Sequence, residues 1–202
     1  MEIEKYCQLI DFIEREVDGI KGEIEGIGNK KSLSFHNLAL DHARSIVILI
    51  NKNSQSSALA LLRVLYESSI RGCWFKYCAT QDQIESFIEN DHLPKLKKLV
   101  KEVDEKMGFS GILDTIHNND MSTLCSFTHS GVIQLSSNFN GKTYKNYYTT
   151  EQIEGALEFA VFYIRISFME IISVASNRNV ELVHSNFETH LTSALNGTKT
   201  VG

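Results

Sequence analysis

The chain contains a single proline, Pro94, among its 202 residues. At the average usage of about 5%, a chain of this length would have about ten prolines. Proline disrupts the interior of a helix and is common in turns, so its near absence favours long helices joined by few tight turns. The sequence therefore predicts an all-α fold. We expect Pro94 in the first turn of a helix, where its missing N–H is tolerated.

Apolar residues recur at three- and four-residue steps along most of the chain, which is the spacing of one face of a helix. The longest predicted helices cover residues 2–19, 33–51, 56–79, 94–107, 150–175 and 180–195, with shorter ones at 81–88, 110–116 and 122–135. No repeat, low-complexity tract or linker divides the chain. We expect a single-domain bundle of about six or seven helices over residues 1–196, with a flexible tail at 197–202.

The charge of the chain limits its partners. The formal net charge is −5. A protein whose whole surface clamps nucleic acid needs an excess of lysine and arginine, so that class is disfavoured, although a local basic pocket stays possible. The apolar window 156–175 contains Glu158, Arg165 and Glu170. Three charges in hydrocarbon are costly, so this window predicts a core helix and no membrane span.

The four cysteines and the N-terminus indicate a cytoplasmic protein. No two cysteines have CxxC spacing, and the N-terminal segment is acidic and amphipathic, unlike a secretory signal. Free thiols of this kind are typical of a reducing compartment. No cofactor motif is present, and Cys125 with His129 gives only two potential zinc ligands. We therefore expect neither a cofactor nor a bound metal.

The helix at 56–79 contains the most informative charges. At about 100° per residue, Arg63, Glu67, Arg71 and Trp74 fall within an arc of about 80°. The rest of the circumference is apolar, which predicts a central helix whose charges need partners. Two arginines and one glutamate leave one positive charge, so one interpretation is a pocket for a phosphate or carboxylate. The other is a structural ion-pair network.

Two further features contain histidine. His129, in the polar segment 128–131, could transfer a proton while nearby arginines hold a phosphate, although a lone histidine is more often a capping or core residue. Arg178 and His184, which have five residues between them, form a weaker alternative pair. Pairs of arginine and histidine with such spacing are frequent by chance, so this pair alone does not indicate a function.

The stretch RVLYESSIRGCWFKYCATQDQIESF, followed by SFTHSG, resembles a family of uncharacterised bacterial helical proteins. The resemblance covers about residues 55–175. The family shares a central helix that contains arginine, glutamate and tryptophan, followed by a His-Gly element. The matching positions in this chain are Arg63, Glu67, Arg71, Trp74, His129 and Gly131.

More distantly, the chain is similar to the HEPN superfamily of helical bundles. Many HEPN proteins are metal-independent ribonucleases of bacterial toxin–antitoxin and phage-defence systems, and they act as dimers. Their signature is an arginine, then a histidine after four to six positions. Arg178, followed by Asn179 and then His184, matches it near the C-terminal end, whereas His129 has no arginine at that distance before it.

Two functional hypotheses follow. In the first, the chain is a metal-independent, ribonuclease-like effector of a bacterial toxin–antitoxin or phage-defence system and forms a homodimer. Arg63 and Arg71 then bind the phosphate of RNA, Glu67 orients an arginine, and His129 acts as general acid or base. In the second, the chain is a non-catalytic helical module that binds a partner protein or a small anion, and the same residues form a structural network.

Overall fold

A computed structural model describes residues 2–139, 142 and 148–196 of the chain. Within these ranges the fold is all-α. Nine helices form it: α1 (Ile3–Val17), α2 (Ile27–Asn51), α3 (Gln55–Tyr77), α4 (Gln81–Asn90), α5 (Leu96–Met107), α6 (Ile112–Thr128), α7 (Val132–Ser136), α8 (Thr150–Ile172) and α9 (Val180–Asn196). The expected flexible tail, 197–202, lies outside the described residues.

The all-α prediction is confirmed, but the helix count differs from the expected six or seven. The short helix expected at 81–88 is α4, whereas the segment expected at 122–135 is divided between the end of α6 and the separate helix α7. The polar segment 117–121 was expected to separate two helices, yet it lies inside the continuous helix α6. Pro94 was expected within the first turn of a helix. It lies before it instead, because α5 begins at Leu96 after the N-cap residue Lys95.

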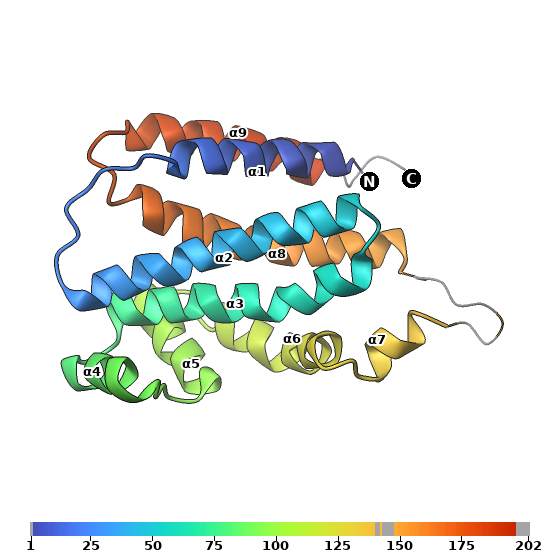
Figure 1. Cartoon of the computed structure of the whole chain (residues 1–202), viewed down its shortest axis with the longest axis horizontal. Helices are drawn as coiled ribbons and strands as arrows, with labels where there is room; N and C mark the ends of the chain where they lie inside the picture. The colour runs from blue at the N-terminus through green and yellow to red at the C-terminus, as the bar shows by residue number, and fades with distance from the viewer. Residues whose placement is uncertain (1, 140–141, 143–147, 197–202) are drawn as a thin grey trace.

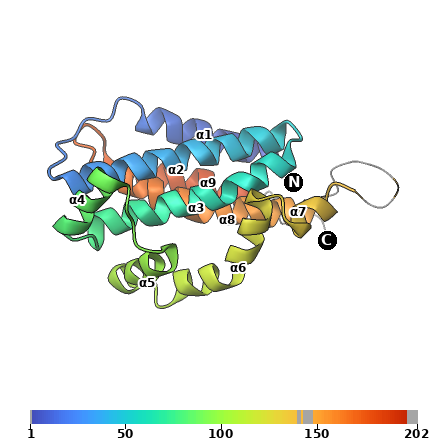
Figure 2. The same ribbon diagram turned by 60° about the horizontal axis from the view of Figure 1, so that its bottom comes forward.

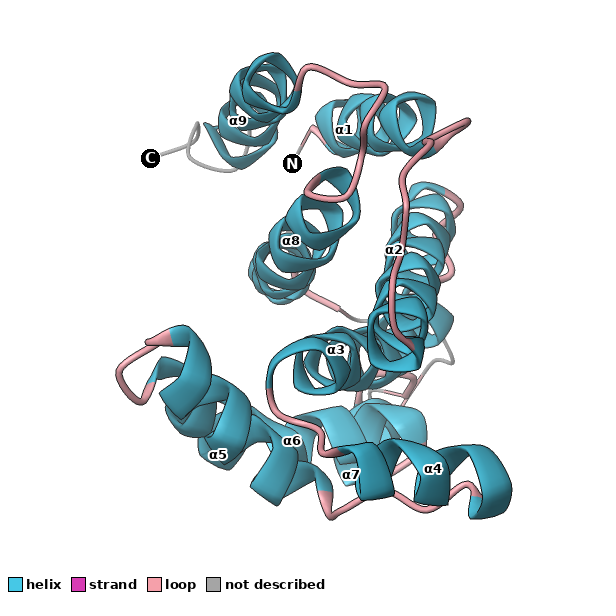
Figure 3. Cartoon of the chain, turned by 90° about the vertical axis from the view of Figure 1, so that its left-hand side faces the viewer, coloured by secondary structure: helices cyan, strands magenta, loops and turns pink. Residues whose placement is uncertain are grey.

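The helices form stacked layers (Figures 1 and 3). The first and last helices, α1 and α9, lie side by side at the top of Figure 1. Below them α2 and α8 pack on each other and on α3. The third layer, α4 to α7, lies below α3, and Figure 2 turns it towards the viewer. Helix α3 contacts α2, α5, α6 and α8, so it is the centre of the bundle.

The sequence of α3 explains its central position. Its buried side chains lie on nearly all sides of the helix, and four of them, Leu65, Tyr66, Ile70 and Trp74, are each at most 1% exposed. A helix that is apolar around its whole circumference is stable only where neighbours cover every face. The prediction of a buried central helix is therefore confirmed.

Helices α2 and α3 approach each other closely at Gly72. A Cβ atom there would lie 2.6 Å from Nε2 of His36, so this position has no space for a larger residue. His36 is fully buried, and its Nδ1 contacts the Ser167 hydroxyl at 3.2 Å. Burial lowers the pKa of His36 to about 4, because the charged imidazolium cannot be solvated there.

Two of the charged residues in α8, Glu170 and Arg165, have partners on other helices. Glu170 accepts hydrogen bonds from Lys76 Nζ at 2.5 Å and from the Tyr77 hydroxyl at 2.8 Å, and Arg165 pairs with Glu188 of α9 at 3.0 Å. In the part of the chain that is described, no helix combines the length and the apolar character that crossing a bilayer requires. All four cysteines are free thiols.

A buried carboxylate holds the start of α6. Asp104, in α5, accepts backbone hydrogen bonds from Gly111 and Leu113 at 2.6 Å each and from Asp114 at 3.2 Å. These N–H groups belong to the first turn of α6, where no helical carbonyl can accept them. Asp104 thus fixes the direction in which α6 runs across α3.

Candidate functional site

Three charged residues of α3 form the centre of the candidate site. Glu67 lies one turn from Arg63 and one turn from Arg71. Its Oε1 accepts from Arg63 Nε at 2.7 Å and its Oε2 accepts from Arg71 Nη2 at 2.9 Å. The side chains are 25%, 14% and 34% exposed for Arg63, Glu67 and Arg71. One carboxylate between two guanidinium groups leaves one positive charge in a half-buried position.

Helix α6 contributes the other half of the site. Nη1 of Arg63 lies 2.7 Å from Nε2 of His129 and donates to Sγ of Cys125 at 3.4 Å. A guanidinium group can only donate, so Nε2 of His129 is the acceptor and its ring hydrogen lies on Nδ1. The hydrogen bond to Glu67 is the main cause that raises the pKa of Arg63. The structure therefore brings together all four predicted residues, Arg63, Glu67, Arg71 and His129.

The end of α6 is tied to α3 just before His129. The Thr128 hydroxyl donates to the carbonyl of Leu124 in its own helix at 2.9 Å and approaches the carbonyl of Ala60 in α3 at 3.2 Å. His129 is the C-cap residue of α6, and its backbone N–H donates to the Cys125 carbonyl. This attachment sets the distance between the imidazole and the arginine.

A tight turn follows His129. Ser130 has a positive φ of 54°, and the N–H of Gly131 donates to the Ser126 carbonyl at 2.7 Å. A Cβ atom on Gly131 would lie 2.5 Å from the Ser126 hydroxyl, so only glycine fits. The glycine of the His-Gly element is thus required by the turn that ends α6.

Two other polar groups extend the site along α3. Nε of Arg71 is buried and has no hydrogen-bond partner among the described residues. The indole Nε1 of Trp74 donates to Oε2 of Glu102 in α5 at 2.6 Å. Trp74 therefore links α3 to α5, although the sequence places it on the same face as the arginines.

The weaker predicted pair has separate contacts. Arg178 donates from Nη2 to the Asp18 carbonyl at 2.7 Å and from Nε to the Glu16 carbonyl at 3.2 Å, so it holds the end of α1. His184 lies on α9, where its Nε2 is 3.5 Å from Glu188.

Sequence reasoning missed some contacts around the site. It considered Cys125 only as a possible zinc ligand, whereas its sulfur contacts Arg63. The buried pair of Tyr66 and His117, whose hydroxyl and Nδ1 are 2.8 Å apart, was also missed. Burial is the main cause that lowers the pKa of His117. Tyr66 lies among the apolar residues of its helix, but His117 lies in the polar segment 117–121, so neither position indicates a buried pair. Across the described ranges, no cluster of three or more His, Cys, Asp or Glu side chains could hold a metal ion.

A comparison with family models matches residues 36–196 to a family of unknown function, DUF6988. The match includes α3 to α9 and therefore every residue of the charged cluster. Neither the comparison with curated proteins nor the comparison with solved structures gives a match. Since the family match spans most of the sequence, the chain belongs to the DUF6988 family.

Proposed function

We propose that the chain is a metal-independent, ribonuclease-like effector of a bacterial toxin–antitoxin or phage-defence system. The observation that carries this proposal is the 2.7 Å contact between Arg63 Nη1 and His129 Nε2. RNA cleavage without a metal needs positive charge at the phosphate and a proton-transfer group that reaches the same phosphate. A guanidinium and an exposed imidazole in direct contact can supply both.

The proposed reaction uses the ribose 2′-hydroxyl as nucleophile. Its oxygen attacks the adjacent phosphorus and loses its proton, while the bond from phosphorus to the 5′ oxygen breaks and that oxygen gains a proton. The products are a 2′,3′-cyclic phosphate and a 5′-hydroxyl. In this proposal His129 transfers one of these protons, and Arg63 and Arg71 stabilise the charge on the phosphate oxygens. Glu67 orients the two guanidinium groups.

The binding step follows from the hydrogen bonds of the site. A phosphate oxygen that accepts the N–H of Arg63 replaces Nε2 of His129 as the acceptor. The imidazole nitrogen then becomes available for proton transfer at the bound phosphate. Nε of Arg71 has no acceptor among the described residues, so it is a further donor on the side of the site where the phosphate would bind.

A HEPN-like fold and assembly into a homodimer belong to this proposal. Its support is the all-helical fold and the pairing of arginine with histidine. The arginine comes from a position 66 residues before His129, on a different helix, rather than from four to six positions before it. The chemistry would be shared with HEPN ribonucleases while the placement of the arginine differs.

The test is cleavage of a labelled RNA in the presence of EDTA. We expect wild-type protein to give products with 2′,3′-cyclic phosphate ends and His129→Ala to lose cleavage by about 10²-fold or more, as removal of a general acid or base does. His92→Ala, which changes an exposed histidine in another part of the chain, is the matched control and should retain full activity. Folded wild-type protein that neither cleaves RNA nor slows growth on overexpression would end the proposal.

A second candidate function is a non-catalytic module that binds a small anion. It is favoured by the position of Glu67, which already pairs with both arginines as a structural network would. Calorimetry with inorganic phosphate and a short RNA separates the two functions. Binding that is lost in Arg71→Ala, without RNA cleavage by the wild type, supports the module and excludes the ribonuclease.

A further inference from the structure

A hollow in the surface of the molecule lies between α6 and α8, over α3. Its volume is about 400 Å³, which lies within the size range of small-molecule sites. Leu59 and Leu62 of α3 line it, Leu124 and Phe127 come from α6, and Phe159 comes from α8. None of the charged residues of the Arg63 and His129 site lines this hollow.

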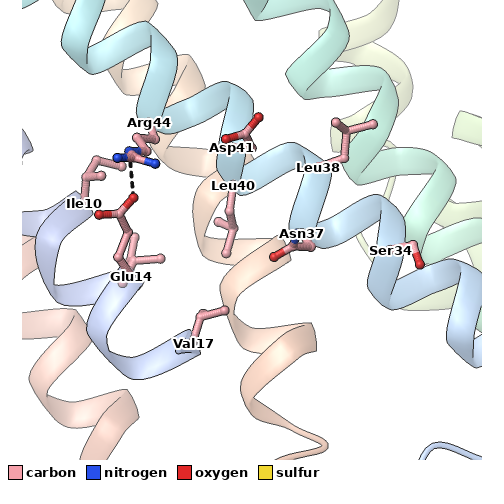
Figure 4. Close-up of a pocket in the computed structure, with 10 residues that line it drawn as sticks. Ile10, Glu14, Val17, Ser34, Asn37, Leu38, Leu40, Asp41 and Arg44 are labelled. Carbon is pink, nitrogen blue, oxygen red and sulfur yellow. Dashed lines mark ion pairs between the residues drawn. The ribbon is translucent and has the colours of Figure 1, made fainter. Parts of the chain in front are cut away.

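One charge lies in this apolar lining. Asp120 of α6 is the only charged residue that lines the hollow, and among the described residues it has no hydrogen-bond or ion-pair partner. The hollow between α1 and α2, shown in Figure 4, is different. Its volume is about 500 Å³, and there Glu14 pairs with Arg44 at 2.7 Å. The carboxylate of Asp120 is therefore available to a ligand of opposite charge.

The aromatic side chains favour the same kind of ligand. Phe127 and Phe159 line the hollow, and behind Phe159 lie Tyr163 and Tyr66, with ring centroids 5.0 and 6.3 Å from its own. These neighbours hold the Phe159 ring in place. The faces of aromatic rings attract cations, so a carboxylate next to two phenyl rings suits an organic cation.

Gly155 keeps the hollow open on the side of α8. It lies inside a 23-residue helix, where glycine is less favourable than alanine. A Cβ atom built on it meets nothing within 4 Å, so neither packing nor backbone conformation requires glycine here. A side chain at this position would extend into open space beside the hollow that Gly155 lines.

We propose that the hollow between α6 and α8 binds an organic ammonium ion with an apolar body. The apolar part contacts the leucine and phenylalanine side chains, and the ammonium group pairs with the carboxylate of Asp120. This site is separate from the proposed ribonuclease site and does not depend on it.

Three probes of similar size and different charge test the proposal: 3-phenylpropylamine, 3-phenylpropanol and 3-phenylpropanoate. Titration calorimetry with the full chain at neutral pH measures their affinities. We expect the amine to bind about tenfold more tightly than the alcohol, because the hydrogen bond to the carboxylate is charge-assisted. The carboxylate probe should bind more weakly than the alcohol.

Two variants place the binding in this hollow. Asp120→Asn should remove the preference for the amine, so that the amine and the alcohol bind with about equal affinity. Gly155→Leu should weaken all binding by filling the hollow, while its melting temperature stays equal to or above that of the wild type because leucine favours the helix. Asp41→Asn, which changes a carboxylate of the hollow between α1 and α2, is the control and should leave binding unchanged.

The proposal is overturned if the amine does not bind, if amine and alcohol bind equally to the wild type, or if Asp120→Asn retains the preference. Self-association of the wild type that Gly155→Leu abolishes would also overturn it, since a second copy of the chain would then occupy the hollow. These results do not depend on whether the protein cleaves RNA.

Discussion

Replacement of Glu67 by alanine removes the one carboxylate that lies between Arg63 and Arg71. The variant loses two charge-assisted hydrogen bonds, of 2.7 and 2.9 Å. Such bonds contribute about 1.5–3 kcal/mol each when buried and about 0–1 kcal/mol when exposed. The Glu67 side chain is 14% exposed, but the arginines are 25% and 34% exposed, which lowers the value for each bond. We expect the free energy of unfolding to fall by about 2 kcal/mol in total.

Urea denaturation and thermal unfolding measure this change. For a chain of this size, a loss of about 2 kcal/mol lowers the melting temperature by about 4–8 °C. The control is Glu105→Ala, which removes a 68% exposed carboxylate that is 3.9 Å from Lys101, and which should cost less than about 0.5 kcal/mol. If Glu67→Ala and Glu105→Ala lower the free energy of unfolding by the same amount, the charged cluster on α3 behaves as an ordinary surface ion pair, and the expected loss of about 2 kcal/mol is refuted.

Three further predictions concern the packing of the bundle. Gly72→Ala should lower the free energy of unfolding by about 1–2 kcal/mol, because overpacking against His36 costs more than the gain of about 1 kcal/mol in helix propensity. An unchanged midpoint of urea denaturation would contradict this prediction and show that the imidazole moves aside. His36 has a pKa of about 4 in the folded chain, below its ordinary value of 6.5, so the unfolded chain binds the proton first and stability falls as the pH decreases from about 6.5 to 4. The free energy of unfolding should fall by about 3 kcal/mol at most over this pH range, and it should fall less steeply with pH in His36→Gln than in the wild type. Equal slopes of stability against pH in both proteins would contradict the assignment to His36. Asp104→Ala should cost about 2–3 kcal/mol and speed hydrogen exchange at the amides of the first turn of α6, whereas wild-type exchange there would mean that water replaces the carboxylate.

The sequence determines the central part of the fold through α3. Its apolar residues surround the whole helix, and a helix of that kind can lie only in the middle of a bundle. The pairing of Glu67 with both arginines also follows from the sequence, because residues four apart on a helix are neighbours. Both features depend on short-range spacing, which a single sequence displays directly.

The meeting of Arg63 with His129 could not be derived in the same way. It depends on the direction of α6 across α3, and this direction is set by Asp104 and Thr128 through contacts between different helices. The polar segment 117–121 indicated a break that the structure does not contain. The sequence could not show that a capped start and an attached end hold these polar residues within one helix.

The pairing of α1 with α9 has a consequence for the order in which the chain folds. Phe12 of α1 packs on His190 of α9 with ring centroids 4.7 Å apart, and Arg178, just before α9, binds the backbone at the end of α1. A main partner of α1 is thus a helix that lies more than 150 residues later in the chain and is synthesised after it. Until that helix emerges from the ribosome, α1 lacks the cover that α9 provides, and docking of the two helices closes a loop of more than 150 residues, which is slow compared with local helix pairing.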